Sequence, residues 1–128
     1  MAAMRVTHPD VAEPPPETWS NCLVAGNHIF VAGLTARTGT QILADDEYGQ
    51  SQAIFDKMAK LLDAAGASMA DVVKVVIYVT DISRREEVWR ARREFFAGDF
   101  PVSTLVEVSA LAMPELKVEI EAIAVRSG

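Results

Sequence analysis

The stretch Asp71–Thr80, DVVKVVIYVT, decides the fold. β-Branched residues fill both of its alternating sets of positions, so a strand formed here has two apolar faces. A strand of this kind is covered on both sides in a folded protein. Helices can cover one side, and we expect a second copy of the chain to cover the other.

Helical spacing occurs on both sides of this strand. One apolar stripe predicts a helix over 47–65 with Gly66 at its C-terminal cap; it comprises Ile54, Phe55, Met58, Leu61, Leu62 and Ala65. After the strand, Val88, Ala91 and Phe95 recur at helical spacing behind Ser83–Glu86, which has the spacing of a capping box. The second helix is therefore predicted over 84–96.

The remaining segments predict strands and loops. Gly26-Asn27 between two apolar runs is typical of a tight β-hairpin, whereas the prolines at 14–16 and the polar residues 35–40 predict loops. The order of elements predicts one two-layer α+β domain over 1–128, a mixed sheet with two helices on one face. The other expected strands are 4–8, 21–25, 29–32, 104–110 and 116–125.

Composition excludes several classes of function. The net charge is −6, so the basic footprint of a nucleic-acid binder is missing. One cysteine, Cys22, and two scattered histidines make no disulfide or zinc pattern, and we expect no metal and no cofactor. No stretch reaches the ~20 apolar residues of a membrane span, and Met1–Asp10 does not read as a signal peptide. We expect a cytoplasmic protein with no membrane partner. Half of the residues are hydrophobic, which favours burial of apolar surface between subunits.

Several strings, in this order and spacing, resemble the RidA/YjgF (Rid) family. They are Ala25–Asn27, Val31–Gly33, LDAAG at 62–66, VVKVVIYVTD at 72–81, Phe100-Pro101, STLVEV at 103–108 and EIEAIAV at 119–125. The resemblance implies a chorismate-mutase-like α+β fold and a homotrimer with a central β-barrel and small-metabolite clefts between subunits. Characterised members hydrolyse reactive enamines or imines to a keto acid and ammonia, and others are described as ribonucleases.

The resemblance also suggests site residues. The family's water-orienting glutamate matches Glu119, and its cleft glycine matches Gly33. In deaminating members an arginine two residues after the Phe-Pro proline binds the substrate carboxylate, but here that residue is Ser103. A hydroxyl supplies neither the charge nor the bidentate geometry of a guanidinium. The chain therefore resembles an Arg-lacking subfamily, and we expect little activity on 2-aminoacrylate-type imines.

Three further positions depart from the family pattern. Leu105 replaces a cysteine, Trp19 a tyrosine and Trp89 an asparagine. Together with Ser103 they form the expected substrate-binding set, and they favour a flatter and less acidic ligand. Trp89 has an alternative role, because Arg85 and Arg93 lie at helical neighbour spacing for cation–π packing.

Other residues have structural interpretations. Glu119 is either the group that activates water or a strand carboxylate that faces solvent or pairs with Lys117. Glu107 and Glu121 either join it in an acidic cluster or accept structural hydrogen bonds, and the structural role is favoured. The arginines of the second helix alternate with glutamates, which predicts a solvated, paired face; they are Arg84, Arg85, Arg90, Arg92 and Arg93.

Two functions remain open at this point. The first is a hydrolase of a C=N or related bond in the clefts between subunits. The second is a non-catalytic trimer that binds or senses a small metabolite. A ribonuclease is disfavoured by the acidic net charge.

Overall fold

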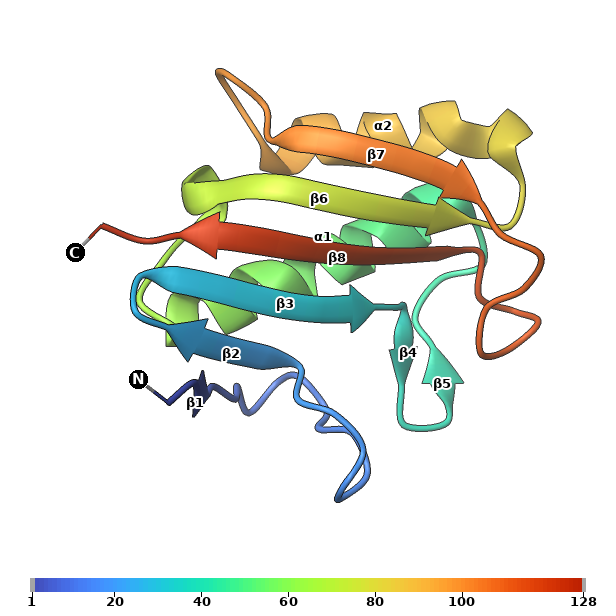
Figure 1. Cartoon of the computed structure of the whole chain (residues 1–128). Coiled ribbons are helices and arrows are strands. Elements are labelled where there is room, and N and C mark those ends of the chain that lie inside the picture. Colours follow the sequence, from blue (N-terminus) through green and yellow to red (C-terminus); the bar gives the residue numbers. More distant parts are fainter. Residues whose placement is uncertain (1, 128) are drawn as a thin grey trace.

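The computed structural model describes residues 2–127. Its six-stranded sheet has the order β1-β2-β3-β8-β6-β7, and α1 and α2 lie on one face of it (Figure 1). The pair β6–β7 is parallel and the other pairs are antiparallel, so the sheet is mixed and the fold is α+β. The elements are β1 Met4–Arg5, β2 Cys22–Ala25, β3 His28–Leu34, β4 Arg37–Thr38, β5 Gln41–Ile42, α1 Glu47–Ala64, β6 Val72–Val79, α2 Arg85–Phe95, β7 Val102–Glu107 and β8 Val118–Val125.

The core lies between the sheet and the helices. The predicted apolar stripe of α1 is buried there, together with the inward-facing residues Val75, Ile77 and Val79 of β6 and Ile120 of β8. The ring centres of Phe55 in α1 and Phe95 in α2 lie 5.4 Å apart, so these side chains pack the two helices together. The period of apolar residues therefore predicted the buried face of α1 correctly.

The opposite face of the sheet carries the second apolar set of β6. Val73 is 46% exposed, and Val102 and Val106 of the neighbouring edge strand β7 are 68% and 40% exposed. Phe30 of β3 and Val125 of β8 are exposed as well. The prediction that Asp71–Thr80 has two apolar faces is confirmed, and one of these faces is uncovered in the single chain.

Several boundaries differ from the sequence predictions. β7 begins at Val102 and ends at Glu107, earlier at both ends than the predicted 104–110. β1 is shorter than 4–8, and β8 begins at 118 rather than 116. The predicted loop 35–40 contains β4, which pairs with β5 through a turn at Gly39, whose φ is 62°. Short pairings of this kind lack an apolar alternation that a sequence pattern can reveal.

The predicted capping box at Ser83–Glu86 does not form. The side chain of Asp81 instead accepts hydrogen bonds from the backbone N–H and the hydroxyl of Ser83, at 3.0 and 2.6 Å. This contact begins a short 3₁₀ turn, Ile82–Arg84, and α2 follows it without a side-chain cap. Among residues 2–127, no helix is long and apolar enough to cross a membrane.

Candidate functional site

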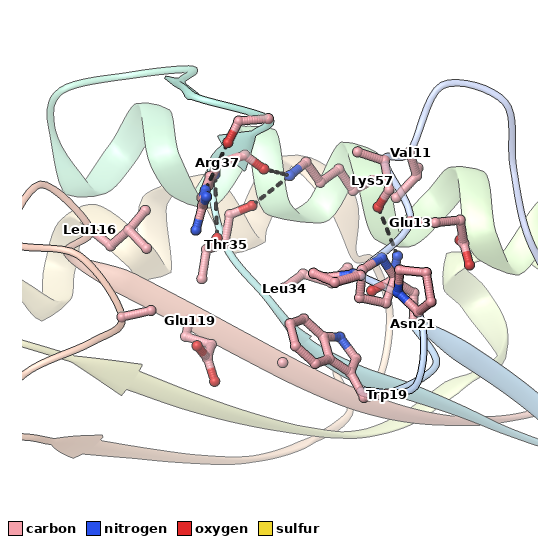
Figure 2. A pocket seen from close by; sticks show the side chains of 17 residues that line it. Val11, Glu13, Trp19, Asn21, Leu34, Thr35, Arg37, Lys57, Leu116 and Glu119 are labelled. Carbon is pink, nitrogen blue, oxygen red and sulfur yellow. Dashed lines mark hydrogen bonds between the residues drawn. The ribbon is translucent and has the colours of Figure 1, made fainter.

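A cavity of about 650 Å³ opens where the ends of β3 and β8 meet α1 and the proline-rich segment 11–16 (Figure 2). It brings together three residues that the sequence singled out, Trp19, Gly33 and Glu119. Glu119 and Trp19 lie on one side of the cavity, and Thr35, Arg37 and Lys57 lie on the opposite side (Figure 2). The cavity therefore has an acidic and aromatic side and a cationic side.

Gly33 makes room for the carboxyl group of Glu119. The register between β3 and β8 shifts between Val31 and Leu34, and Gly33 lies within this irregularity. A Cβ atom at position 33 would lie 2.8 Å from Cδ of Glu119 and would overlap Oε2 as well. Carbon atoms in proteins do not approach so closely, so the absence of a side chain at Gly33 sets the position of this carboxyl group.

The surroundings of Glu119 favour its neutral form. Burial raises the pKa of this carboxyl group, and the charge of Glu121 on the same face raises it further. Glu121 accepts a hydrogen bond of 2.6 Å from the hydroxyl of Tyr78, and Glu107 accepts one of 2.9 Å from the backbone N–H of Ile82. Glu107 thus has the structural role that was favoured, and within residues 2–127 Glu119 forms no ion pair with Lys117.

The cationic side of the cavity was not predicted from the sequence. Lys57 is 9% exposed, and its ammonium donates hydrogen bonds to the carbonyl oxygens of Thr35 and Arg37 at 2.8 and 2.5 Å. Burial lowers the pKa of Lys57. Nε of Arg37 donates to the carbonyl of Gly39 at 2.8 Å. Because Lys57 lies off the apolar stripe of α1, its sequence position indicated solvent rather than a cavity wall.

The other three predicted residues lie elsewhere in the chain. Ser103 and Leu105 belong to β7, an edge strand, and Trp89 belongs to α2 beside it (Figure 1). None of the three lines the cavity that holds Glu119. Leu105 is half-buried against the hydrophobic core. The predicted site residues therefore fall into two groups within one chain.

An arginine reaches Ser103 from the neighbouring helix. Nη1 of Arg92 donates a hydrogen bond of 2.9 Å to Oγ of Ser103. The guanidinium carbon atoms of Arg92 and Arg85 both lie 5.8 Å from the centre of the Trp89 ring. The predicted packing of Trp89 with Arg85 is confirmed, but its second cation is Arg92 and not Arg93, which instead lies 3.9 Å from Glu86. Arg92 and Ser103 are 11 residues apart along the sequence and belong to different elements, so the sequence did not indicate this contact.

The cysteine is structural. Cys22 is fully buried, and burial raises its pKa to about 11. A thiol with so high a pKa is not a nucleophile at neutral pH.

Comparison with known proteins points to one family. The family model "Endoribonuclease L-PSP" matches residues 11–126. A Pseudomonas aeruginosa protein of unknown function is 39% identical, with a TM-score of 0.90 over 97% of this chain and 92% of its own. A YjgF-family protein of Mycobacterium tuberculosis is 33% identical, with a TM-score of 0.81 over 98% of this chain and 100% of its own.

One curated relative has a named activity. A 2-iminobutanoate/2-iminopropanoate deaminase of Dermatophagoides farinae is 29% identical over 128 residues, which are 98% of each chain. The family match, the shared fold and the paired Gly33 and Glu119 agree with the motifs seen in the sequence. The chain therefore belongs to the endoribonuclease L-PSP family, which is the RidA/YjgF (Rid) family.

Proposed function

We propose that this chain is a small-molecule hydrolase of the Rid family that acts on a C=N or related bond, in the manner of the family's imine deaminases. One observation carries the proposal. The carboxyl group of Glu119 lies in a cavity of about 650 Å³, held over Gly33, with a pKa raised by burial. A carboxyl group whose pKa is raised is a better proton acceptor than an ordinary carboxylate, and it can return that proton to the substrate.

The chemistry requires one water and one proton carrier. Water adds to the carbon of the C=N bond while Glu119 accepts a proton from it. The protonated Glu119 then donates to the nitrogen, and the tetrahedral intermediate collapses to a carbonyl compound and ammonia. A group that moves between these two states works best when its pKa lies near the operating pH, and the raised pKa of Glu119 is a shift in that direction.

The active assembly in this proposal is a homotrimer with a central β-barrel. The uncovered apolar face of the sheet, which includes Val73, Val102 and Val106, would line the subunit contacts. The edge strand β7 of one subunit would then approach the cavity of the next. This arrangement supports a site in which Glu119, Gly33 and Trp19 of one subunit meet Ser103, Leu105 and Trp89 of another.

The substrate in this proposal differs from the usual small carboxylate imine. Ser103 supplies no charge where deaminating members have an arginine, which supports membership of an Arg-lacking subfamily. The half-buried indole of Trp89 and the exposed indole of Trp19 add flat apolar surface. We expect an imine or enamine with a flat, unsaturated or aromatic body.

Glu119→Gln tests the proposal. Ammonia release from imines generated in situ, including the imine of phenylpyruvate, should fall by ~10²–10⁴-fold, the usual contribution of a positioned acid–base group. Ligand affinity should change little, because the rest of the ligand keeps its contacts. Glu107→Gln is the matched control, since among residues 2–127 the side chain of Glu107 accepts a hydrogen bond only from the backbone N–H of Ile82.

Two results would contradict the hydrolase. An unchanged rate in Glu119→Gln would remove Glu119 from the mechanism. Ligand binding without turnover of any imine in the panel would leave the alternative, a trimer that binds or senses a metabolite. Substitution of Glu119 would then act through affinity alone.

A further inference from the structure

Arg92 and Arg85 are the two arginines within 84–93 that have no carboxylate partner among residues 2–127, and Arg85 instead donates from Nη1 to the carbonyl oxygen of Ile82 at 3.2 Å. Arg84, Arg90 and Arg93 lie 3.5, 2.7 and 3.9 Å from the carboxylates of Glu47, Glu87 and Glu86. Within residues 2–127 no carboxylate pairs with Arg92. The prediction of a solvated, paired arginine face is therefore wrong for Arg85 and Arg92, and of these two only Arg92 has a buried N–H without an acceptor.

Arg92 is also short of hydrogen bonds. Its Nε is buried and has no acceptor among residues 2–127, and only Nη1 has a partner, Oγ of Ser103. Burial lowers the pKa of Arg92, with a smaller contribution from Arg93. A partly buried cation with a buried free N–H is costly unless an acceptor arrives, and a carboxylate is the acceptor that matches a guanidinium best.

The surroundings of Arg92 hold its guanidinium in place. Ser103 on β7 binds Nη1 from one side, and the Trp89 ring lies 5.8 Å from its carbon atom. A guanidinium fixed by a hydroxyl and an indole loses little freedom when it binds an anion. The same indole presents a flat surface next to the place where the anion would bind.

We infer that Arg92 is the carboxylate-binding residue of the substrate site, and that the ligand is a carboxylate with a flat unsaturated or aromatic body that packs on Trp89. The inference rests on the proposed function for its place beside Glu119 of another subunit. In this arrangement α2 supplies the guanidinium that β7 lacks, and Ser103 positions it. The ligand is anionic, as in the family's deaminases, in contrast to the less acidic ligand expected from the sequence, and it is bound from the helix and not from the strand.

Arg37 is the competing guanidinium, because it lines the cavity with Glu119. Its Nε already binds the carbonyl of Gly39, and the residue is exposed. The rest of the Arg37 guanidinium is open to solvent, whereas Nε of Arg92 is buried and has no acceptor among residues 2–127. The observations favour Arg92, and the experiment below compares the two.

Calorimetric titration with phenylpyruvate, a flat keto acid of the kind that the proposed reaction releases, tests the inference without turnover. Arg92→Gln should weaken binding by about 30-fold or more, the effect of removing one partner of a buried charged pair. Arg93→Gln, with the same change of charge on the same helix, and Arg37→Gln should each change affinity by less than about threefold. Phenylacetone, which lacks the carboxylate, should bind wild type and Arg92→Gln equally.

Two further variants keep the test decisive if Arg92→Gln folds poorly. Arg92→Lys keeps the positive charge but loses the planar pair of donors. Ser103→Ala removes the hydroxyl that holds Nη1 of Arg92. Both variants should bind phenylpyruvate more weakly than wild type and should keep the wild-type melting temperature. The inference is overturned if wild type does not bind phenylpyruvate, if Arg92→Gln binds it as wild type does, or if Arg37→Gln loses binding instead. Binding through Arg92 without any imine hydrolysis would contradict the proposed function and leave this inference intact. If Arg92→Gln hydrolyses imines at the wild-type rate, this inference is contradicted and the proposed function stands.

Discussion

The cavity around Glu119 and the α2–β7 edge around Arg92 form an electrostatic contrast. In the cavity, burial raises the pKa of a carboxyl group, and at the edge, burial lowers the pKa of a guanidinium. Neither group has a partner of opposite charge within residues 2–127. The cavity holds the carboxyl group that the proposed hydrolysis uses, and the edge holds, outside that cavity, the guanidinium that we infer binds an anion. The cavity has cations of its own in Arg37 and Lys57, but Lys57 already binds two carbonyl oxygens and Arg37 binds a third, whereas Arg92 keeps a buried N–H without an acceptor.

The largest expected effect comes from preventing subunit assembly, because in the proposed trimer the cavity of one subunit meets the α2–β7 edge of the next. Val106→Asp places a charge on the uncovered apolar face of β7, where a subunit contact would bury it at a high free-energy cost. We expect monomers and complete loss of imine hydrolysis. Light scattering should give close to three times 13.9 kDa for wild type and one times that mass for the variant. Ala64→Asp, on the exposed side of α1, is the control and should stay trimeric. A monomeric wild type that retains activity would show that the cavity works without the edge.

A smaller effect is expected from displacing the carboxyl group of Glu119 inside the cavity. Gly33→Ala places a Cβ against the carboxyl group, which is the flexible end of a side chain and has to move away. The rate should fall by roughly 10²-fold, as expected for a displacement of about 1 Å at a reacting group, while the fold survives. Kinetics and a melting curve on the same sample check this. A variant that keeps the wild-type rate would show that the position of Glu119 over Gly33 is unimportant.

Mixed trimers test whether the two regions belong to different subunits. Glu119→Gln and Arg92→Gln should each be nearly inactive alone. If each site takes Glu119 from one subunit and Arg92 from the next, random co-assembly at equal amounts should restore about a quarter of the wild-type sites. Refolding the two variants together, followed by an ammonia assay, measures the recovery. No recovery in mixed trimers would place both residues in a site formed by one subunit.

The smallest effect concerns stability against pH. Because the folded state raises the pKa of Glu119, folded protein binds more protons than unfolded protein between the ordinary and the raised pKa. Wild type should therefore lose stability as the pH rises through that window. Glu119→Gln has no carboxyl group to ionise, so its free energy of unfolding should exceed that of wild type at neutral pH. The difference should become smaller as the pH falls. Urea unfolding at a series of pH values measures the difference. An advantage that stays constant with pH would show that Glu119 is not desolvated.

Much of the fold could be predicted because its signals are local. The apolar stripe of α1 and the two-faced strand at Asp71–Thr80 depend on side-chain periodicity, which secondary structure imposes directly. The Gly26-Asn27 hairpin follows from a local turn preference in the same way, with φ of 62° at Gly26. The prediction failed before the N-terminus of α2, where two side chains could each accept hydrogen bonds from the backbone. Asp81, and not Ser83, is the acceptor there.

The sequence by itself determined the family, the α+β order of elements and the candidate residues Glu119 and Gly33. Only the tertiary structure decided which of the candidates come together. Trp19, Gly33 and Glu119 share a cavity with Lys57 and Arg37, which no motif indicated, while Trp89 and Ser103 lie on another edge. The contact between Arg92 and Ser103 also depends on α2 packing beside β7. The physical reason is that periodicity reports which face of an element is buried, whereas charge pairing and cavity walls depend on which faces meet in space.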